Sequence, residues 1–183
     1  FTFFIDVSGS MRGGMTGGNR MDVAKAQLID QLKVIPVNDD YYLNVYKFGC
    51  TSVPVFPRPL SVNQAVKDRA ISFVSALRAV EGCTVPFAGL AHGIQQEHVE
   101  QMIILTDGGA RDYGICFHDS RPGKFADCVY RYNEKIRNND PSIPHYKTKP
   151  IPIDTISLGL DFCTGNNLPW WVARYNYNPI WMG

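Results

Sequence analysis

The sequence predicts an α/β protein with a doubly wound, mostly parallel sheet of about six strands, helices on both faces and one antiparallel edge strand. Two observations lead to this fold class. Short apolar runs alternate with longer segments whose apolar residues recur at helical spacing, which is the pattern of strand–helix–strand units. Two of the apolar runs stop at an aspartate in a polar, glycine-containing stretch, as expected where buried parallel strands reach a ligand-binding edge.

The first third of the chain contains three predicted strands and one helix. Residues 1–6 form an apolar run of strand length. The glycine-rich stretch 11–19 is a loop by composition and precedes a helix over 21–35, which the next proline ends. Aromatic and β-branched residues predict a second strand over 41–48. The third, over 52–56, contains a proline and is therefore confined to an edge.

Two helices follow. Ser61 and Gln64 have the spacing of a capping box, which predicts a helix from there to about Val80. Residues 81–84 form a loop. Pro86 suits the first turn of the next helix, whose apolar residues continue to position 94.

The remaining elements are a strand ending at Asp107, a helix around 125–136, a strand over 151–158, a short helix over 168–174 and a last edge strand over 175–181. We expect a single domain over 1–183 with an enlarged insertion at about 109–150. Because the chain begins inside a predicted strand, we expect it to be excised from a larger protein.

The composition excludes several functions. The chain has 183 residues, of which 45% are hydrophobic and 19% charged, as in globular domains. A net charge of +1 argues against a broad nucleic-acid surface, and no apolar run has the ~18 residues of a membrane span. An aromatic group near the C-terminus is either packing or an exposed patch for a partner or a glycan: Trp170, Trp171, Tyr175, Tyr177 and Trp181.

Five cysteines leave two alternatives open. Cys116 and Cys128 lie in the same inserted stretch, whereas Cys50 and Cys83 each follow a predicted element on the ligand-binding edge, and Cys163 lies near the C-terminus. Two disulfides, Cys50 with Cys83 and Cys116 with Cys128, and one spare thiol would suit an oxidising compartment. Five reduced, partly buried thiols are the alternative. No Cys-x-x-Cys pair suggests a zinc site.

The strongest motif is Asp6-x-Ser8-x-Ser10 at the end of the first strand. Three oxygen ligands spaced two apart suit a hard cation such as Mg²⁺, Mn²⁺ or Ca²⁺. A turn with an Asx cap is the structural alternative. Asp107, in Leu-Thr-Asp-Gly, likewise ends an apolar run and precedes a glycine, and a turn residue is again the structural alternative.

These motifs, with Gly-Cys-Thr at 82–84, resemble the von Willebrand factor A family, or integrin I-domain fold, and the resemblance covers nearly the whole chain. It implies a metal-ion-dependent adhesion site. There the hydroxyls of Ser8, Ser10 and Thr84 bind a divalent cation, usually Mg²⁺, and the carboxylates of Asp6 and Asp107 act directly or through water. A Glu or Asp of a protein partner fills the open coordination position.

The resemblance implies a metal-dependent protein-binding module for adhesion or assembly, outside the cell, on its surface or in the periplasm. The alternative is a cytoplasmic regulatory domain of an ATPase or metal-chelatase machine. We do not expect an enzyme: a hydrolase needs a general base that we cannot identify, and nothing orients a Cys83–His92 pair. Two departures from the family are the glycine-rich loop after Ser10 and the insertion, which we expect to influence partner choice.

Overall fold

The computed structural model describes residues 1–107, 125–158 and 179–181. Six strands form a sheet in the order β5-β4-β1-β7-β8-β9, and β6 also pairs with β4. Their bounds are β1 Thr2–Asp6, β4 Asn38–Phe48, β5 Ser52–Pro54, β6 Leu60–Val62, β7 Met102–Thr106, β8 Ile153–Ser157 and β9 Pro179–Trp181. The helices are α1 Arg20–Val34, α2 Gln64–Ala76, α3 Phe87–Gln95 and α4 Phe125–Arg137.

The sheet is mixed but mostly parallel. β1 runs parallel to β4 and β7, and β8 runs parallel to β7 and β9. β5 and β6 pair antiparallel with β4. The predicted fold class is therefore confirmed, including the antiparallel edge strand, and the predicted last strand is present over the described residues 179–181.

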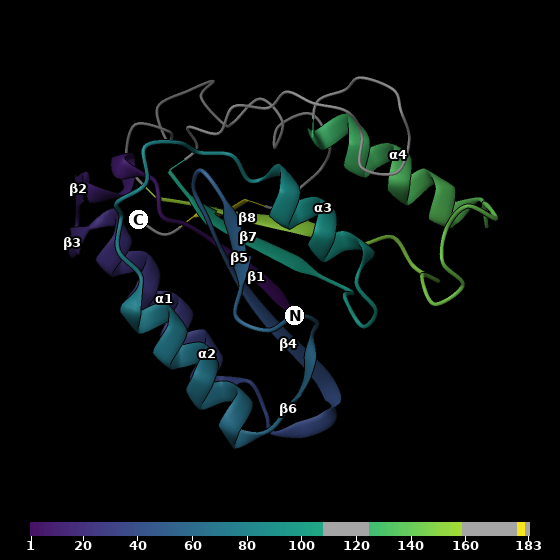
Figure 1. Ribbon diagram of the computed structural model, residues 1–183, viewed down its shortest axis with the longest axis horizontal. Coiled ribbons are helices and arrows are strands. Elements are labelled where there is room, and N and C mark those ends of the chain that lie inside the picture. Colours follow the sequence, from purple (N-terminus) through teal and green to yellow (C-terminus); the bar gives the residue numbers. More distant parts are fainter. Residues whose placement is uncertain (108–124, 159–178, 182–183) are drawn as a thin grey trace.

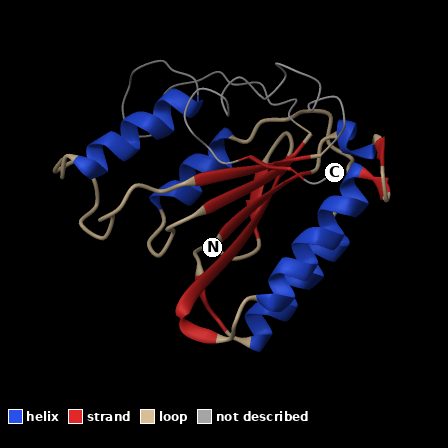
Figure 2. Cartoon of the chain, turned by 180° about the vertical axis from the view of Figure 1, so that it is seen from behind, coloured by secondary structure: helices blue, strands red, loops and turns tan. Residues whose placement is uncertain are grey.

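Helices cover both faces of the sheet. In Figures 1 and 2, α1 and α2 lie on one side of the strands, and α3 and α4 lie on the other. Each layer has its own apolar core: Phe3, Ile5, Leu28 and Val74 belong to the first, and Phe4, Leu90, Ile94 and Tyr132 to the second. β1 is buried throughout and contributes alternate residues to both cores. Its middle residues, 3–5, are all apolar because neither face of the strand meets water.

The predicted capping box at Ser61 is wrong. Ser61 lies inside β6, and the N-cap of α2 is Asn63, whose side chain accepts a hydrogen bond from the Val66 amide. Pairing with β4 keeps Ser61 in an extended conformation, so the helix begins later than the local signal indicates. Helix α2 also ends at Ala76, earlier than the predicted end near Val80.

The early end of α2 has a tertiary cause. The amides of Val80 and Glu81 both donate to the carbonyl of Val7, at 3.1 and 3.2 Å. These bonds draw the chain after α2 to the end of β1, and a helical conformation there would lose them. The segment that carries Glu81 is thus fixed beside the first predicted motif.

The glycine-rich loop contains structure that its composition does not predict. A short 3-10 helix, Gly9–Arg12, is followed by a small hairpin of β2 (Gly14–Met15) and β3 (Gly18–Asn19). Gly17 and Gly18 turn this hairpin with positive φ values of 94° and 138°, which suit glycine.

Two further predictions concern membranes and the C-terminal region. In the part of the chain that the structure describes, every helix is too short or too polar to cross a membrane. The predicted helix over 168–174 and the aromatic side chains near the C-terminus lie outside that part.

Candidate metal site at the end of the first strand

Asp6 is fixed at the end of β1 by hydrogen bonds to both of its carboxylate oxygens. Oδ1 accepts from the Ser8 amide at 2.8 Å, and Oδ2 accepts from the Thr106 hydroxyl at 2.7 Å. The side chain is fully buried. Burial is the largest influence on the pKa of Asp6 and raises it, against these hydrogen bonds, and the nearby charge of Asp107 acts in the same direction.

The two motif serines lie together. The hydroxyl oxygens of Ser8 and Ser10 are 3.0 Å apart. Ser8 is buried and Ser10 is exposed, so the pair extends from the buried end of β1 toward the surface. The register of the parallel strands explains why Asp107 lies near the end of β1. Ile5 pairs with Leu105, which puts the residues after Leu105 beside Asp6.

Asp107 is nearly as buried as Asp6 and forms an ion pair. Arg20, the first residue of α1, approaches its Oδ2 with Nη1 at 3.0 Å. The other oxygen, Oδ1, is buried and accepts no hydrogen bond among the described residues. A buried carboxylate oxygen without a donor costs free energy, so this atom is available to a further cation or donor.

The loop that carries Thr84 is attached to the same edge at several points. Gly9 donates its amide to the Glu81 carbonyl at 2.7 Å, and Val85 donates to the Gly49 carbonyl at 2.8 Å. Thr84 lies between these attachments and is half-buried. Hydrogen bonds connect Asp6, Ser8 and Ser10, and Arg20 connects Ser10 to Asp107. Among the described residues the Thr84 hydroxyl makes no hydrogen bond, so Thr84 is not part of this network.

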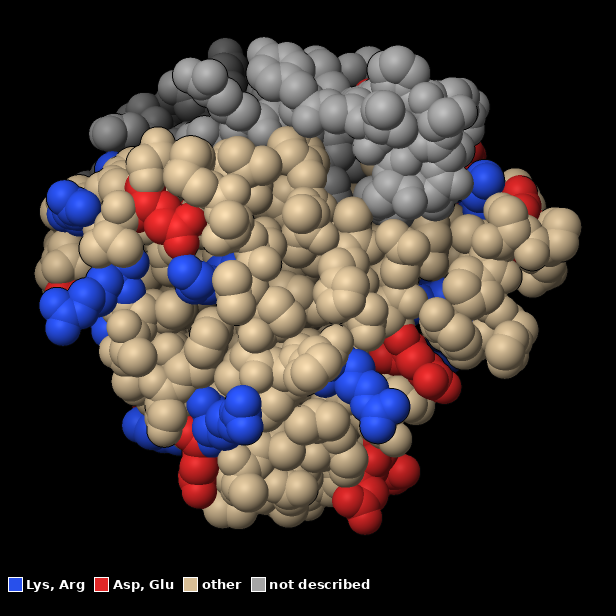
Figure 3. All heavy atoms as spheres, viewed as in Figure 1, with Lys and Arg blue, Asp and Glu red and all other residues tan. Residues whose placement is uncertain are grey.

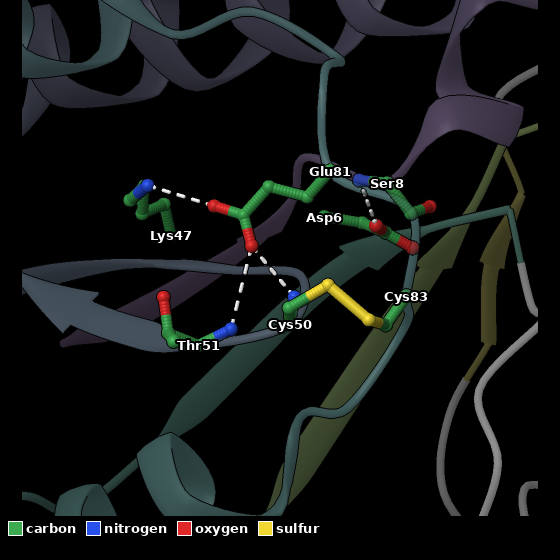
Figure 4. Close-up of a disulfide and its surroundings, with 7 residues drawn as sticks. All are labelled: Asp6, Ser8, Lys47, Cys50, Thr51, Glu81 and Cys83. Atoms are coloured by element: carbon green, nitrogen blue, oxygen red, sulfur yellow. Dashed lines mark hydrogen bonds and ion pairs between the residues drawn. A yellow bond between two sulfur atoms is a disulfide. The ribbon is translucent and has the colours of Figure 1, made fainter.

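Of the two alternatives for these cysteines, the structure has the disulfide: Cys50 is bonded to Cys83, with a Cα–Cα distance of 4.7 Å. It ties the residue before Thr84 to the turn after β4 (Figure 4). Cys128 is also disulfide-bonded. Its predicted partner, Cys116, lies outside the described residues, so that pairing stays a prediction.

Sequence reasoning missed Glu81. Its carboxylate forms an ion pair with Lys47 at 2.8 Å and accepts hydrogen bonds from the amides of Cys50 and Thr51 (Figure 4). The Lys47 hydrogen bond is the largest influence on the pKa of Glu81 and lowers it. A lone glutamate in a loop gives no local signal of this role, because its partners lie at least 30 positions away.

Neither His92 nor the surface charge indicates a second functional site among the described residues. His92 uses both ring nitrogens, Nδ1 with the Tyr46 hydroxyl at 2.8 Å and Nε2 with the Gln96 amide nitrogen at 2.9 Å, so it is engaged away from Cys83. On the face shown in Figure 3, basic and acidic side chains are interspersed, in keeping with the net charge of +1.

Comparisons with known proteins agree with the fold. The sequence model of the von Willebrand factor type A domain matches residues 2–122. A von Willebrand factor A domain-containing protein of Dictyostelium discoideum is 30% identical over 112 residues, which are 59% of this chain and 11% of that protein. The chain thus spans about a tenth of this relative.

Two solved structures are similar in fold at low identity. The PilB minor pilin of Streptococcus sanguinis has a TM-score of 0.57 and 14% identity, covering 99% of this chain and 56% of the pilin. The pilus adhesin SpaC of Lactobacillus rhamnosus GG has a TM-score of 0.58 and 13% identity, covering 85% of this chain and 24% of the adhesin.

Proposed function

The chain belongs to the von Willebrand factor type A domain family, and from this premise we propose that it is a binding module, not an enzyme, that captures an acidic residue of a protein partner through a divalent cation. Asp6, Ser8, Ser10, Thr84 and Asp107 hold the cation, which is Mg²⁺ or, in its place, Mn²⁺ or Ca²⁺. One observation carries the proposal: the Ser8–Ser10 hydroxyl pair and the buried carboxylates of Asp6 and Asp107 lie at the same edge of the sheet.

The residues at this edge suit the cation that the family implies. Hydroxyl and carboxylate oxygens are the ligands that hard divalent cations take in proteins. Asp107 Oδ1 is buried without a donor among the described residues, and the pKa of Asp6 is raised mainly by burial. A bound cation would remove both costs, because it supplies positive charge where two carboxylates lie close together.

The same donor set explains why the partner contributes an acid. The hydroxyls of Ser8, Ser10 and Thr84 carry no charge, and carboxylates that act largely through water compensate the charge of a divalent cation only in part. When bound, the cation supplies a Lewis-acidic position that favours an anionic oxygen from outside. The chain's own residues hold the cation in position, and the partner's Glu or Asp completes the binding.

The surroundings of the site support adhesion or assembly outside the cytoplasm. A disulfide adjoins the threonine loop, and disulfides persist mainly in oxidising compartments. Structures of similar fold include a minor pilin and a pilus adhesin, which suggests a comparable role here. The disulfide disfavours the alternative, a cytoplasmic regulatory domain of an ATPase or chelatase machine.

A peptide-display selection tests this function and does not require the partner to be identified first. The chain is immobilised, exposed to a random-peptide library in about 5–10 mM MgCl₂, which exceeds the cation dissociation constants of typical extracellular modules, and eluted with EDTA. We expect the eluted peptides to be enriched in Asp or Glu at one position. Thr84→Val, which removes the hydroxyl but preserves the shape, should lose this enrichment.

The outcomes are separable. An EDTA-eluted pool without acidic enrichment would contradict capture of a carboxylate. Equal recovery with and without Mg²⁺ would contradict the role of the cation. Circular dichroism of Thr84→Val provides the control, because an unfolded variant would lose binding for an unrelated reason.

A further inference from the structure

Arg20 places a positive charge at the edge of the sheet where the cation is proposed to bind. Its Nη1 lies 3.0 Å from Asp107 Oδ2 and 3.4 Å from the carbonyl oxygen of Ser10. Its side chain is 18% exposed and that of Asp107 is 3% exposed. One guanidinium therefore contacts a proposed carboxylate ligand and the backbone of a proposed hydroxyl ligand.

The local structure holds Arg20 in this position. The Arg20 amide donates to the Gly13 carbonyl at 2.9 Å, and the Asn19 side chain caps the first turn of α1 by accepting from the Asp22 amide. A Cβ added at Gly13 would lie only 3.1 Å from Arg20 Cζ. The glycine-rich loop thus bends back on the start of α1 and leaves room for the guanidinium, which gives a role to the loop that departs from the family pattern.

The pair lacks the geometry of an optimised structural ion pair. A bidentate arginine–carboxylate pair uses two nitrogens and two oxygens. Here Asp107 Oδ1 and Arg20 Nε are both buried and have no hydrogen-bond partner among the described residues. Each ion leaves one buried polar atom unsatisfied, and such atoms carry a desolvation cost. A cation at Asp107 would satisfy the carboxylate, whereas the guanidinium satisfies it only in part.

We propose that Arg20 is an internal competitor of the divalent cation: its guanidinium neutralises Asp107 in the metal-free protein, and metal binding must displace or repel it. The reason is electrostatic, since two cations sharing one buried carboxylate repel each other across a few ångströms of poorly screened protein. Arg20 thereby sets the cation concentration at which the site fills. This inference rests on the proposed function and deepens it.

Calorimetric titration of the whole chain with MnCl₂ and with MgCl₂ tests the proposal. Arg20→Gln removes the charge. Lys33→Gln is the matched control, because it removes one positive charge at the other end of α1, where Lys33 is exposed and pairs only with Asp30 among the described residues. We expect Arg20→Gln to bind the cation roughly tenfold more tightly or better, within the 5–150-fold range common for coupled equilibria, and Lys33→Gln to match the wild type.

Thermal unfolding gives a readout that does not depend on partner binding. In EDTA, Arg20→Gln should melt below the wild type, because Asp107 loses its counter-charge. Saturating Mn²⁺ should raise the melting temperature of Arg20→Gln more than that of the wild type. If Arg20→Gln does not fold, Arg20→Met, which keeps an apolar stem but removes the charge, should still bind the cation more tightly than the wild type.

The possible results separate this inference from the proposed function. Tighter binding by Arg20→Gln than by both other proteins supports competition, including the case in which only Arg20→Gln binds. Equal affinities in all three proteins would overturn the role of Arg20 and leave the metal site standing. Absence of cation binding in every variant would overturn the metal site, and the competition with it.

Discussion

The carboxylate of Glu81 accepts a hydrogen bond from the amide of Cys50, with Oε2 2.6 Å from the nitrogen. Two residues after Glu81, the disulfide from Cys83 reaches the same Cys50. The loop that carries Thr84 is therefore joined to the turn after β4 by a covalent bond and by a charge-assisted hydrogen bond. Its position beside β1 does not depend on the local preferences of the loop, and each tether can be tested separately.

Removal of the Cys50–Cys83 disulfide should destabilise the domain. The bond closes a loop across a sequence separation of 33, for which the chain-entropy relation gives about 4 kcal/mol. We expect Cys50→Ser to lower the free energy of unfolding by about 2–4 kcal/mol, measured by urea denaturation with and without reductant. Added reductant should affect the wild type more than the variant.

A thiol count provides the matching control. With five cysteines in the chain and both Cys50–Cys83 and Cys128 oxidised, denatured, unreduced protein should show a single free thiol. Five free thiols would contradict the disulfides altogether.

Glu81→Gln should make stability less dependent on pH in the acid range. The Lys47 hydrogen bond holds the pKa of Glu81 below its usual 4.5. A carboxyl whose pKa is lower in the folded state than in the unfolded state stabilises the folded protein at pH values above the unfolded-state pKa. This stabilisation is lost as pH falls through the folded-state pKa. We expect the wild type to exceed the variant in free energy of unfolding by about 1–2 kcal/mol at pH 7. This difference should shrink as pH falls below 4.5 and vanish once pH is below the lowered pKa of the folded state.

Urea denaturation at a series of pH values measures this difference. Glu97→Gln is the comparison, since Glu97 is 62% exposed, and it should change stability by less than about 0.5 kcal/mol at every pH. A Glu81→Gln deficit that persists unchanged into acid would mean that the Glu81 charge is not involved.

Asp6→Asn should weaken cation binding at least roughly tenfold without unfolding the domain. The amide can keep both local bonds, because its oxygen accepts from the Ser8 amide and its NH₂ group donates to the Thr106 oxygen. Burial raises the pKa of Asp6, so a neutral group here does not add to the cost of folding. We expect stability in EDTA to stay within about 1 kcal/mol of the wild type.

Titration with MgCl₂ measures the other half of this prediction. The affinity for Mg²⁺ should fall at least roughly tenfold. This is the lower end of the loss that is typical when a residue that contacts the metal only indirectly is replaced. Unchanged Mg²⁺ affinity in a folded Asp6→Asn variant would remove Asp6 from the site.

Gly93→Ala should destabilise the second core. A Cβ at Gly93 would lie 2.7 Å from Phe4 Cζ, and Phe4 is fully buried at the centre of the sheet. Overpacking of this kind costs about 1–3 kcal/mol, which exceeds the gain of at most about 1 kcal/mol from replacing glycine in a helix. Thermal denaturation measures the loss. Gly14→Ala should be nearly neutral, because nothing lies within 4 Å of a Cβ there among the described residues.

The order and type of most elements could be predicted because their causes are local. A short apolar run, such as residues 3–5 in β1 or 102–105 in β7, suits a strand buried on both faces, and the apolar spacing of α1 predicts a helix from the residues themselves. The aspartates at the ends of β1 and β7 were recognisable for the same reason: each follows its apolar run closely in the sequence.

The ion pairs around the proposed metal site depend on the tertiary structure. Arg20 and Asp107 are 87 positions apart, and Glu81 and Lys47 are 34 positions apart. Neither pair has a local pattern in the sequence, because the fold brings its two members together from distant segments. Ser61 shows the converse, since a valid local capping signal yields to strand pairing with β4. Local free energies thus determined which segments became strands and helices, whereas sheet register and burial determined which charges meet.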